Sequence, residues 1–172
     1  METSEILESL LQQCSKSQQN IFPIVVNACL SSQLIIGCLS KDNEYARLQY
    51  SLIEEYKSNV ERERNIVDSV EESKKEKGEI DQNVWVIYTL LPFDLMEIIS
   101  RQALLINEIH DENPQNTLEY SMAISYLRAA RYAAFLLVRQ RMSSMKDINI
   151  IADIKRRFDD IPVIPAFEWE IK

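Results

Sequence analysis

The sequence predicts an all-α protein: a bundle of five or six helices with one long antiparallel helical hairpin and an extended C-terminal tail, in a single domain over residues 1–172. Only 2 of the 172 residues are glycine and only 5 are proline. Glycine supplies the positive φ of tight turns and lets the backbone approach a phosphate closely. A chain this poor in glycine is unsuited to many hairpin turns or to a phosphate-binding loop. Apolar residues also recur every three or four positions over long stretches, which is the spacing of a helix face.

Two helices are expected before residue 41. The first begins at Thr3 or Ser4, whose hydroxyl groups can cap a helix, and ends before residue 20. The second begins at Pro23, since proline is favoured in the first turn of a helix, and ends at about Leu39. It is apolar nearly all round, so we expect it at the centre of the bundle.

Residues 21–39 are also long and apolar enough to span a membrane. Asn27 and Gln33 interrupt the segment with polar side chains, and no aromatic belt flanks it. The first residues of the chain are acidic rather than basic, unlike those of a signal peptide. We therefore expect a buried core helix and no membrane span.

The helical hairpin is expected at residues 41–110. Its first helix extends from Lys41 to Lys77 and ends at Gly78, because glycine commonly follows the last turn of a helix. The charged run at residues 74–79 is the expected tip between the two antiparallel helices.

The second helix of the hairpin is expected to begin at Ile80 and to kink or break at Pro92, because proline lacks the N–H that bonds to the preceding turn. Asp94 and Glu97 have the spacing of a capping box, which indicates a new start. The helical pattern then continues to His110.

The second half of the first hairpin helix is mainly charged. Its apolar residues form a thin seam that includes Val60, Val67 and Val70. Such a helix either projects from the body or pairs along a narrow coiled-coil contact. We predict that these three valines bind a partner helix or a second copy of the chain.

A long helix is expected from Asn116 or Thr117 to about Met145, followed by a shorter one from Asp147 to Phe158. The apolar residues of the long helix include Leu118, Met122, Tyr126, Ala129, Ala133, Leu136 and Leu137. These residues have the spacing of a helix face.

This long helix is basic in an acidic protein. Arg128, Arg131 and Arg139 lie near one face, because eleven residues return close to the same angle around a helix. Two interpretations remain open. The stripe either pairs within the molecule with the acidic helix around residues 54–72, or it binds an acidic segment of a partner.

The C-terminal tail, residues 161–172, is expected to be extended because it contains Pro162 and Pro165. Phe167 and Trp169 are costly to leave in water. The tail is therefore expected either to fold back over the bundle or to dock on a partner.

The net charge of −8 and the sequence pI of about 4.8 argue against direct binding to nucleic acid or to an anionic membrane. The acidity either serves solubility or lets the chain occupy a basic site on another protein. The three cysteines form no disulfide or zinc pattern, so a reducing compartment, cytoplasm or nucleus, is expected.

No catalytic, cofactor-binding or metal-binding motif is present. The chain has one histidine, His110, and a helix would place the nearby Glu108 about 200° away from it. We therefore expect no catalytic residues, no cofactor and no bound metal. The expected function is a non-enzymatic protein–protein interaction module, a small scaffold or adaptor subunit of a larger complex that forms hetero- or homo-oligomers through helical surfaces. The alternative is an acidic inhibitor or regulator that blocks a basic binding site on another protein.

Overall fold

The computed structural model describes Val25, Cys29, Leu30, Ser32 and residues 43–112 and 114–170. Every regular element in these residues is a helix, which confirms the all-α class. The α-helices are α3 (Asn43–Lys77), α4 (Gln82–Glu112), α5 (Thr117–Met142) and α6 (Ile148–Asp160). Two 3₁₀ turns, η1 (Pro114–Asn116) and η2 (Glu168–Glu170), complete the order. The two helices expected before residue 41 lie outside the described residues, apart from the four single positions.

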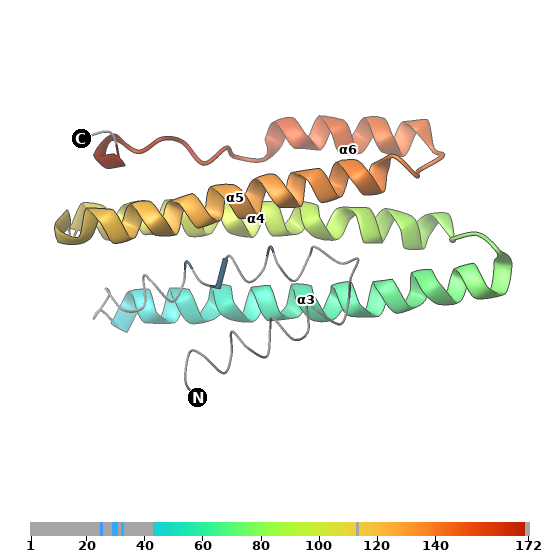
Figure 1. Ribbon diagram of the computed structural model, residues 1–172, viewed down its shortest axis with the longest axis horizontal. Coiled ribbons are helices and arrows are strands. Elements are labelled where there is room, and N and C mark those ends of the chain that lie inside the picture. The colour runs from blue at the N-terminus through green and yellow to red at the C-terminus, as the bar shows by residue number, and fades with distance from the viewer. Residues whose placement is uncertain (1–24, 26–28, 31, 33–42, 113, 171–172) are drawn as a thin grey trace.

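The turn between α3 and α4 forms where the sequence predicts it. Gly78 has a φ of 70°, a conformation that glycine adopts without steric cost, and its N–H donates to the Lys74 carbonyl over 3.1 Å. Asp81 then accepts the N–H of Asn83 over 2.9 Å at the start of α4. The two helices are antiparallel and lie side by side (Figure 1).

Of the kink or break expected at Pro92, the break is wrong, because α4 is continuous from Gln82 to Glu112. The new start expected at Asp94 is therefore wrong as well. Proline removes the donor for the carbonyl four residues earlier, which is that of Tyr88. The guanidinium of Arg141 replaces this donor, since its Nη1 donates to the Tyr88 carbonyl over 2.5 Å. A side chain from α5 thus satisfies the helix at its proline.

α4 packs against both α3 and α5 (Figure 1). Its buried residues include Leu91, Leu95, Ile99 and Ile106, each at most 1 % exposed. α5 ends at Met142, three residues earlier than expected, and α6 begins after Asp147. The carboxylate of this capping residue accepts the N–H groups of Asn149 and Ile150.

A buried polar cluster connects α3, α4 and the described part of the preceding segment. The hydroxyl of Tyr56 donates to Gln102 Oε1, and Gln102 Nε2 donates to the Cys29 carbonyl and to Ser32 Oγ over 3.3 and 3.2 Å. Burial raises the pKa of the Cys29 thiol to about 12. Cys29 is therefore a neutral, small core residue, as its apolar sequence context suggests.

The tail runs back along the bundle beside the first half of α5 (Figure 1). Ser100 of α4 donates to the Pro162 carbonyl over 2.9 Å, and Trp169 Nε1 donates to Asn107 Oδ1 over 2.8 Å. Residues 162–167 have no regular structure, but residues 168–170 form the turn η2. The expectation of a wholly extended tail is thus wrong at its aromatic end, where the turn places Trp169 against α4.

Candidate protein-binding surfaces

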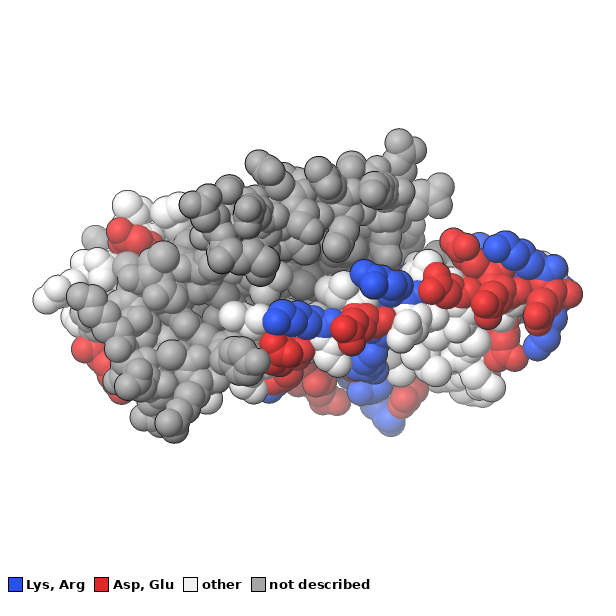
Figure 2. Space-filling model, turned by 90° about the horizontal axis from the view of Figure 1, so that it is seen from below, with Lys and Arg blue, Asp and Glu red and all other residues white. Residues whose placement is uncertain are grey.

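The predicted valine seam lies in the half of α3 that leads to the turn. Val70 is buried, Val60 and Val67 are half-buried, and Val60 packs against the core. Around it the surface is charged. Figure 2 shows Lys and Arg side chains interleaved with Asp and Glu along the middle of α3, and mainly Asp and Glu, bordered by Lys and Arg, toward the turn. The valines therefore offer a partner only a narrow strip, and their role in binding stays a prediction.

The arginine that reaches the acidic helix is Arg141, which the predicted stripe did not include. Its Nη1 and Nη2 donate to Glu63 Oε2 and Oε1 over 3.1 and 2.6 Å. The two side chains are 4 % and 2 % exposed. This paired geometry connects α5 to α3 in the interior, where a charge-assisted bond is strong and an uncompensated charge is costly.

Aromatic side chains of α4 complete this buried site. The guanidinium carbon of Arg141 lies 3.6 Å from the centroid of the Tyr88 ring, and Trp85 Nε1 donates to the Arg141 carbonyl over 3.0 Å. Together with the bond to the Tyr88 carbonyl, these contacts occupy the arginine on several sides. The site is a structural junction of three helices, and Pro92 was the sequence signal that such a donor would be required.

Two of the three predicted stripe arginines contact the tail. Arg128 donates from both Nη atoms to the carboxylate of Glu170 over 2.7 Å and also bonds to the Pro165 carbonyl. Nη2 of Arg131 donates to the Ile161 carbonyl over 3.4 Å. The structure therefore places these arginines in internal contacts with a segment other than the acidic helix. No pattern in the sequence predicts which tail residue meets which arginine.

The pKa of Glu170 is lowered from its ordinary value. The hydrogen bond from Arg128 is the largest cause, and the backbone N–H of Phe167, which donates over 2.9 Å, adds to it against an opposing effect of burial. The ionised carboxylate therefore helps to hold the tail on α5.

Arg139, the third arginine of the stripe, is exposed. Its guanidinium carbon lies 5.7 Å from the ring centroid of Phe135, one turn earlier on α5. Arg139 is thus separated from the tail contacts of Arg128 and Arg131.

The predicted tail aromatics form a stacked cluster with the lone histidine. The rings of Trp169 and His110 are stacked with centroids 4.2 Å apart, Phe167 stacks on Trp169 at 5.6 Å, and Tyr120 meets the His110 ring edge-on at 5.3 Å. Phe167 is 8 % exposed. These contacts match the fold-back alternative for the tail. His110 Nε2 lies 3.3 Å from Thr117 Oγ1, between α4 and α5.

An exposed apolar stripe runs along α5, and sequence reasoning did not separate it from the core. Its large residues are Leu118, Met122, Tyr126, Tyr132 and Leu136, which are 44–70 % exposed. Four of these five belong to the apolar set predicted for this helix from its spacing. Of the predicted set Leu137 is buried, and the helix otherwise packs through Tyr120, Ile124, Leu127, Ala134 and Val138; all six are at most 5 % exposed. Apolar spacing alone could not distinguish two apolar sides of one helix.

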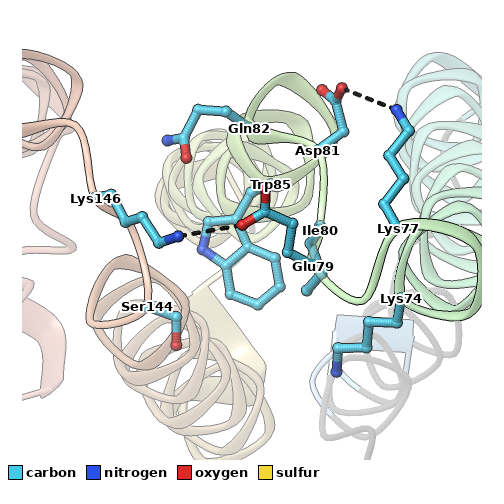
Figure 3. A pocket seen from close by; sticks show the side chains of 9 residues that line it. All are labelled: Lys74, Lys77, Glu79, Ile80, Asp81, Gln82, Trp85, Ser144 and Lys146. Atoms are coloured by element: carbon cyan, nitrogen blue, oxygen red, sulfur yellow. Dashed lines mark hydrogen bonds and ion pairs between the residues drawn. The ribbon is translucent and has the colours of Figure 1, made fainter.

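A pocket of about 590 Å³ lies at the other end of the molecule, between the α3–α4 turn and the segment that joins α5 to α6. Figure 3 shows Lys77 paired with Asp81 and Lys146 paired with Glu79 near the Trp85 ring, at 3.9 and 3.3 Å. The only hydroxyl side chain that lines the pocket is that of Ser144. Most of the charged lining is engaged in these ion pairs.

Among the described residues, no group of three or more His, Cys, Asp or Glu side chains could hold a metal ion. One described helix, α4, is long and apolar enough to cross a membrane by length and composition. Half of its most apolar window is buried inside the protein, which is typical of a core helix.

No protein-family model matches the sequence, and no curated protein or solved structure is significantly similar to it.

Proposed function

We propose that this chain is a non-enzymatic protein–protein interaction module, a small scaffold or adaptor subunit that assembles through its helical surfaces. The observation that carries the proposal is the exposed apolar stripe along α5, from Leu118 to Leu136. Large apolar patches in contact with water commonly mark interaction sites. The inner side of α5 is already packed against α4, so the fold does not require the exposed stripe.

Charge supports this function over that of an acidic inhibitor. Along the middle of α3 the acidic residues alternate with Lys and Arg side chains, and the acidic group toward the turn is bordered by basic ones (Figure 2). Several are also paired within the chain: Glu55 with Arg101, Glu54 with Lys57, and Glu63 with Arg141. A protein that blocks a basic site by charge alone would need a continuous acidic face.

We also propose the number of helices and the role of the hairpin end. The complete chain has five or six helices, and the end of the α3–α4 hairpin acts as a coiled-coil-like projection. The protein works in the cytoplasm or nucleus, binds no nucleic acid directly and has no membrane span. Val67→Asp tests the hairpin: a loss of assembly with an unchanged melting temperature supports a partner contact. Normal assembly with a lower melting temperature makes the seam internal.

Affinity purification of the tagged full chain tests the function. Leu136→Arg places a charge in the stripe, whereas Ile148→Arg makes the same change at a 79 % exposed residue at the start of α6. We expect the first variant to lose specific protein partners, including a tagged second copy, and the control to keep them. Equal recovery by the wild type and both variants would contradict the assignment of binding to α5.

A further inference from the structure

The stripe contains a seam with the spacing of a coiled coil. The seam residues follow at alternating intervals of four and three: Leu118, Met122, Ser125, Ala129, Tyr132 and Leu136. Ser125 and Ala129 are exposed, like the four larger residues. At 100° and 1.5 Å per residue, the seam occupies a band about 80° wide and about 27 Å long. This is the alternation by which two helices interlock their side chains.

The order of sizes along the seam is the same from both ends: large, large, small, small, large, large. A contact between two identical chains related by a two-fold axis must be complementary to itself. We propose that the seam is the contact between two copies of this chain, which pair with their α5 helices antiparallel. The proposal rests on the proposed function and names the occupant of the α5 surface.

With the two-fold axis at the level of Leu127, every seam residue has a matching residue in the second copy. Leu118 faces Leu136 of the second copy. Met122 faces Tyr132 of the second copy, and Ser125 faces Ala129 of the second copy. The two smallest residues thus meet at the centre, where short side chains allow two helix axes to approach most closely. The larger residues fill the widening space toward both ends.

The charges around the seam permit two antiparallel copies. α5 has no acidic residue after Glu119. Arg128, Arg131 and Arg141 are engaged in internal contacts, whereas Arg139 is exposed beside the seam. Arg128 is neutralised by Glu170 and so can lie near its own symmetry mate.

An interface built on one pair of helices is at the small end of specific protein contacts. We therefore expect a concentration-dependent equilibrium between monomer and dimer. Sedimentation equilibrium of the full-length protein over about a hundredfold concentration range measures its dissociation constant. A mass that stays monomeric at every concentration would overturn the inference.

Tyr132→Glu tests whether the seam forms the contact. Each dimer would then bury two carboxylates against Met122 of the opposite copy, and we expect the dissociation constant to rise at least about tenfold. The matched control is Val163→Glu in the tail, at a residue that is 73 % exposed and outside the seam, and it should leave dimerisation unchanged. A dimer that is indifferent to Tyr132→Glu, or equally weakened by Val163→Glu, would refute the seam.

The double variant Met122→Lys with Tyr132→Glu tests the register. In the antiparallel dimer each new lysine faces a new glutamate of the other copy, so the double variant should regain most of the lost affinity. Within one chain the two positions are ten residues, or about 15 Å, apart along α5, too far for a direct ion pair. In a parallel dimer like charges would face one another, so a double variant weaker than Tyr132→Glu alone would overturn the antiparallel arrangement.

These outcomes separate the inference from the proposed function. A monomeric wild type that still loses defined partners on Leu136→Arg retains the interaction module but rejects the second copy as its occupant. A wild type that dimerises, is disrupted by Tyr132→Glu and is restored by the double variant supports both.

Discussion

The side of α5 that faces α4 and the side that faces solvent are both apolar, but they differ in how their side chains are used. Tyr120, Ile124 and Leu127 on the inner side are fully buried, whereas Leu118 and Tyr132 on the outer side are 70 % and 63 % exposed. Burial of a large apolar side chain stabilises a structure by roughly 1.5–3 kcal/mol. The inner side has already contributed this free energy to folding. On the outer side it is still available for association.

The largest expected effect on stability is at Arg141, near the C-terminal end of the inner side of α5. Arg141→Met removes the cation that faces Glu63 and the donor that bonds to the Tyr88 carbonyl. We expect a loss of about 3–5 kcal/mol in the free energy of unfolding, measured by urea denaturation. The control Arg139→Met changes an exposed arginine two residues away and should alter this free energy by less than about 0.5 kcal/mol. Equal losses for the two variants would mean that the buried arginine contributes no more to stability than the exposed one.

A matched pair of leucines compares the two sides directly. Leu127→Ala leaves a cavity at a fully buried position, and we expect a loss of about 3 kcal/mol. Leu136→Ala removes the same atoms from a residue that is 44 % exposed and should cost less than about 1 kcal/mol. Both are measured by thermal and urea unfolding at a protein concentration low enough to avoid association. A larger effect at Leu136 would show that the stripe belongs to the core.

The tail gives a third, smaller contrast, between internal packing and partner binding. Trp169→Ala removes the stack on His110 and the hydrogen bond to Asn107. We expect a loss of roughly 1–3 kcal/mol of stability, seen as a lower melting temperature. An unchanged melting temperature together with weaker partner binding would instead indicate that Trp169 contacts a partner.

The smallest expected effect depends on pH. Because the pKa of Glu170 is lower in the folded chain than its ordinary value near 4.5, its contribution is present above that value and is lost as the pH falls through the folded-state pKa. Glu170 is largely buried but Arg128 is partly exposed, so we expect a contribution of only about 1 kcal/mol.

Glu170→Gln removes the ionisable group and should reduce the acid-dependent loss of stability. Melting curves of the wild type and the variant between neutral pH and pH 3 measure the difference. Curves that fall in parallel across this range would mean that Glu170 does not contribute to the pH dependence.

Local features of the fold were the easiest to predict. The end of α3 at Gly78 and the cap of α6 at Asp147 follow from backbone conformation and side-chain hydrogen bonds within a few residues. The continuity of α4 at Pro92 could not be predicted in this way. The residue that compensates the missing donor, Arg141, lies 53 positions from the carbonyl that it satisfies.

The candidate site shows the same limit. Spacing indicated that Leu118, Met122 and Leu136 have the periodicity of a helix face, but it could not say whether that face is the buried one. The arginine stripe was recognised from composition, yet the pairing of Arg128 with Glu170 depends on where the tail returns. Two nearly opposite apolar sides on one helix each fit a helical repeat, and only packing distinguishes them.

By itself, the sequence determined the helical class, several helix ends and the apolar character of α5, because these depend on backbone preferences and side-chain periodicity within a few turns. Only the tertiary structure decided that Arg141 meets Glu63, that Trp169 stacks on His110 and that the stripe from Leu118 to Leu136 remains exposed. These outcomes depend on which distant surfaces meet when α4 buries one side of α5, and a single helix can bury only the side that it contacts.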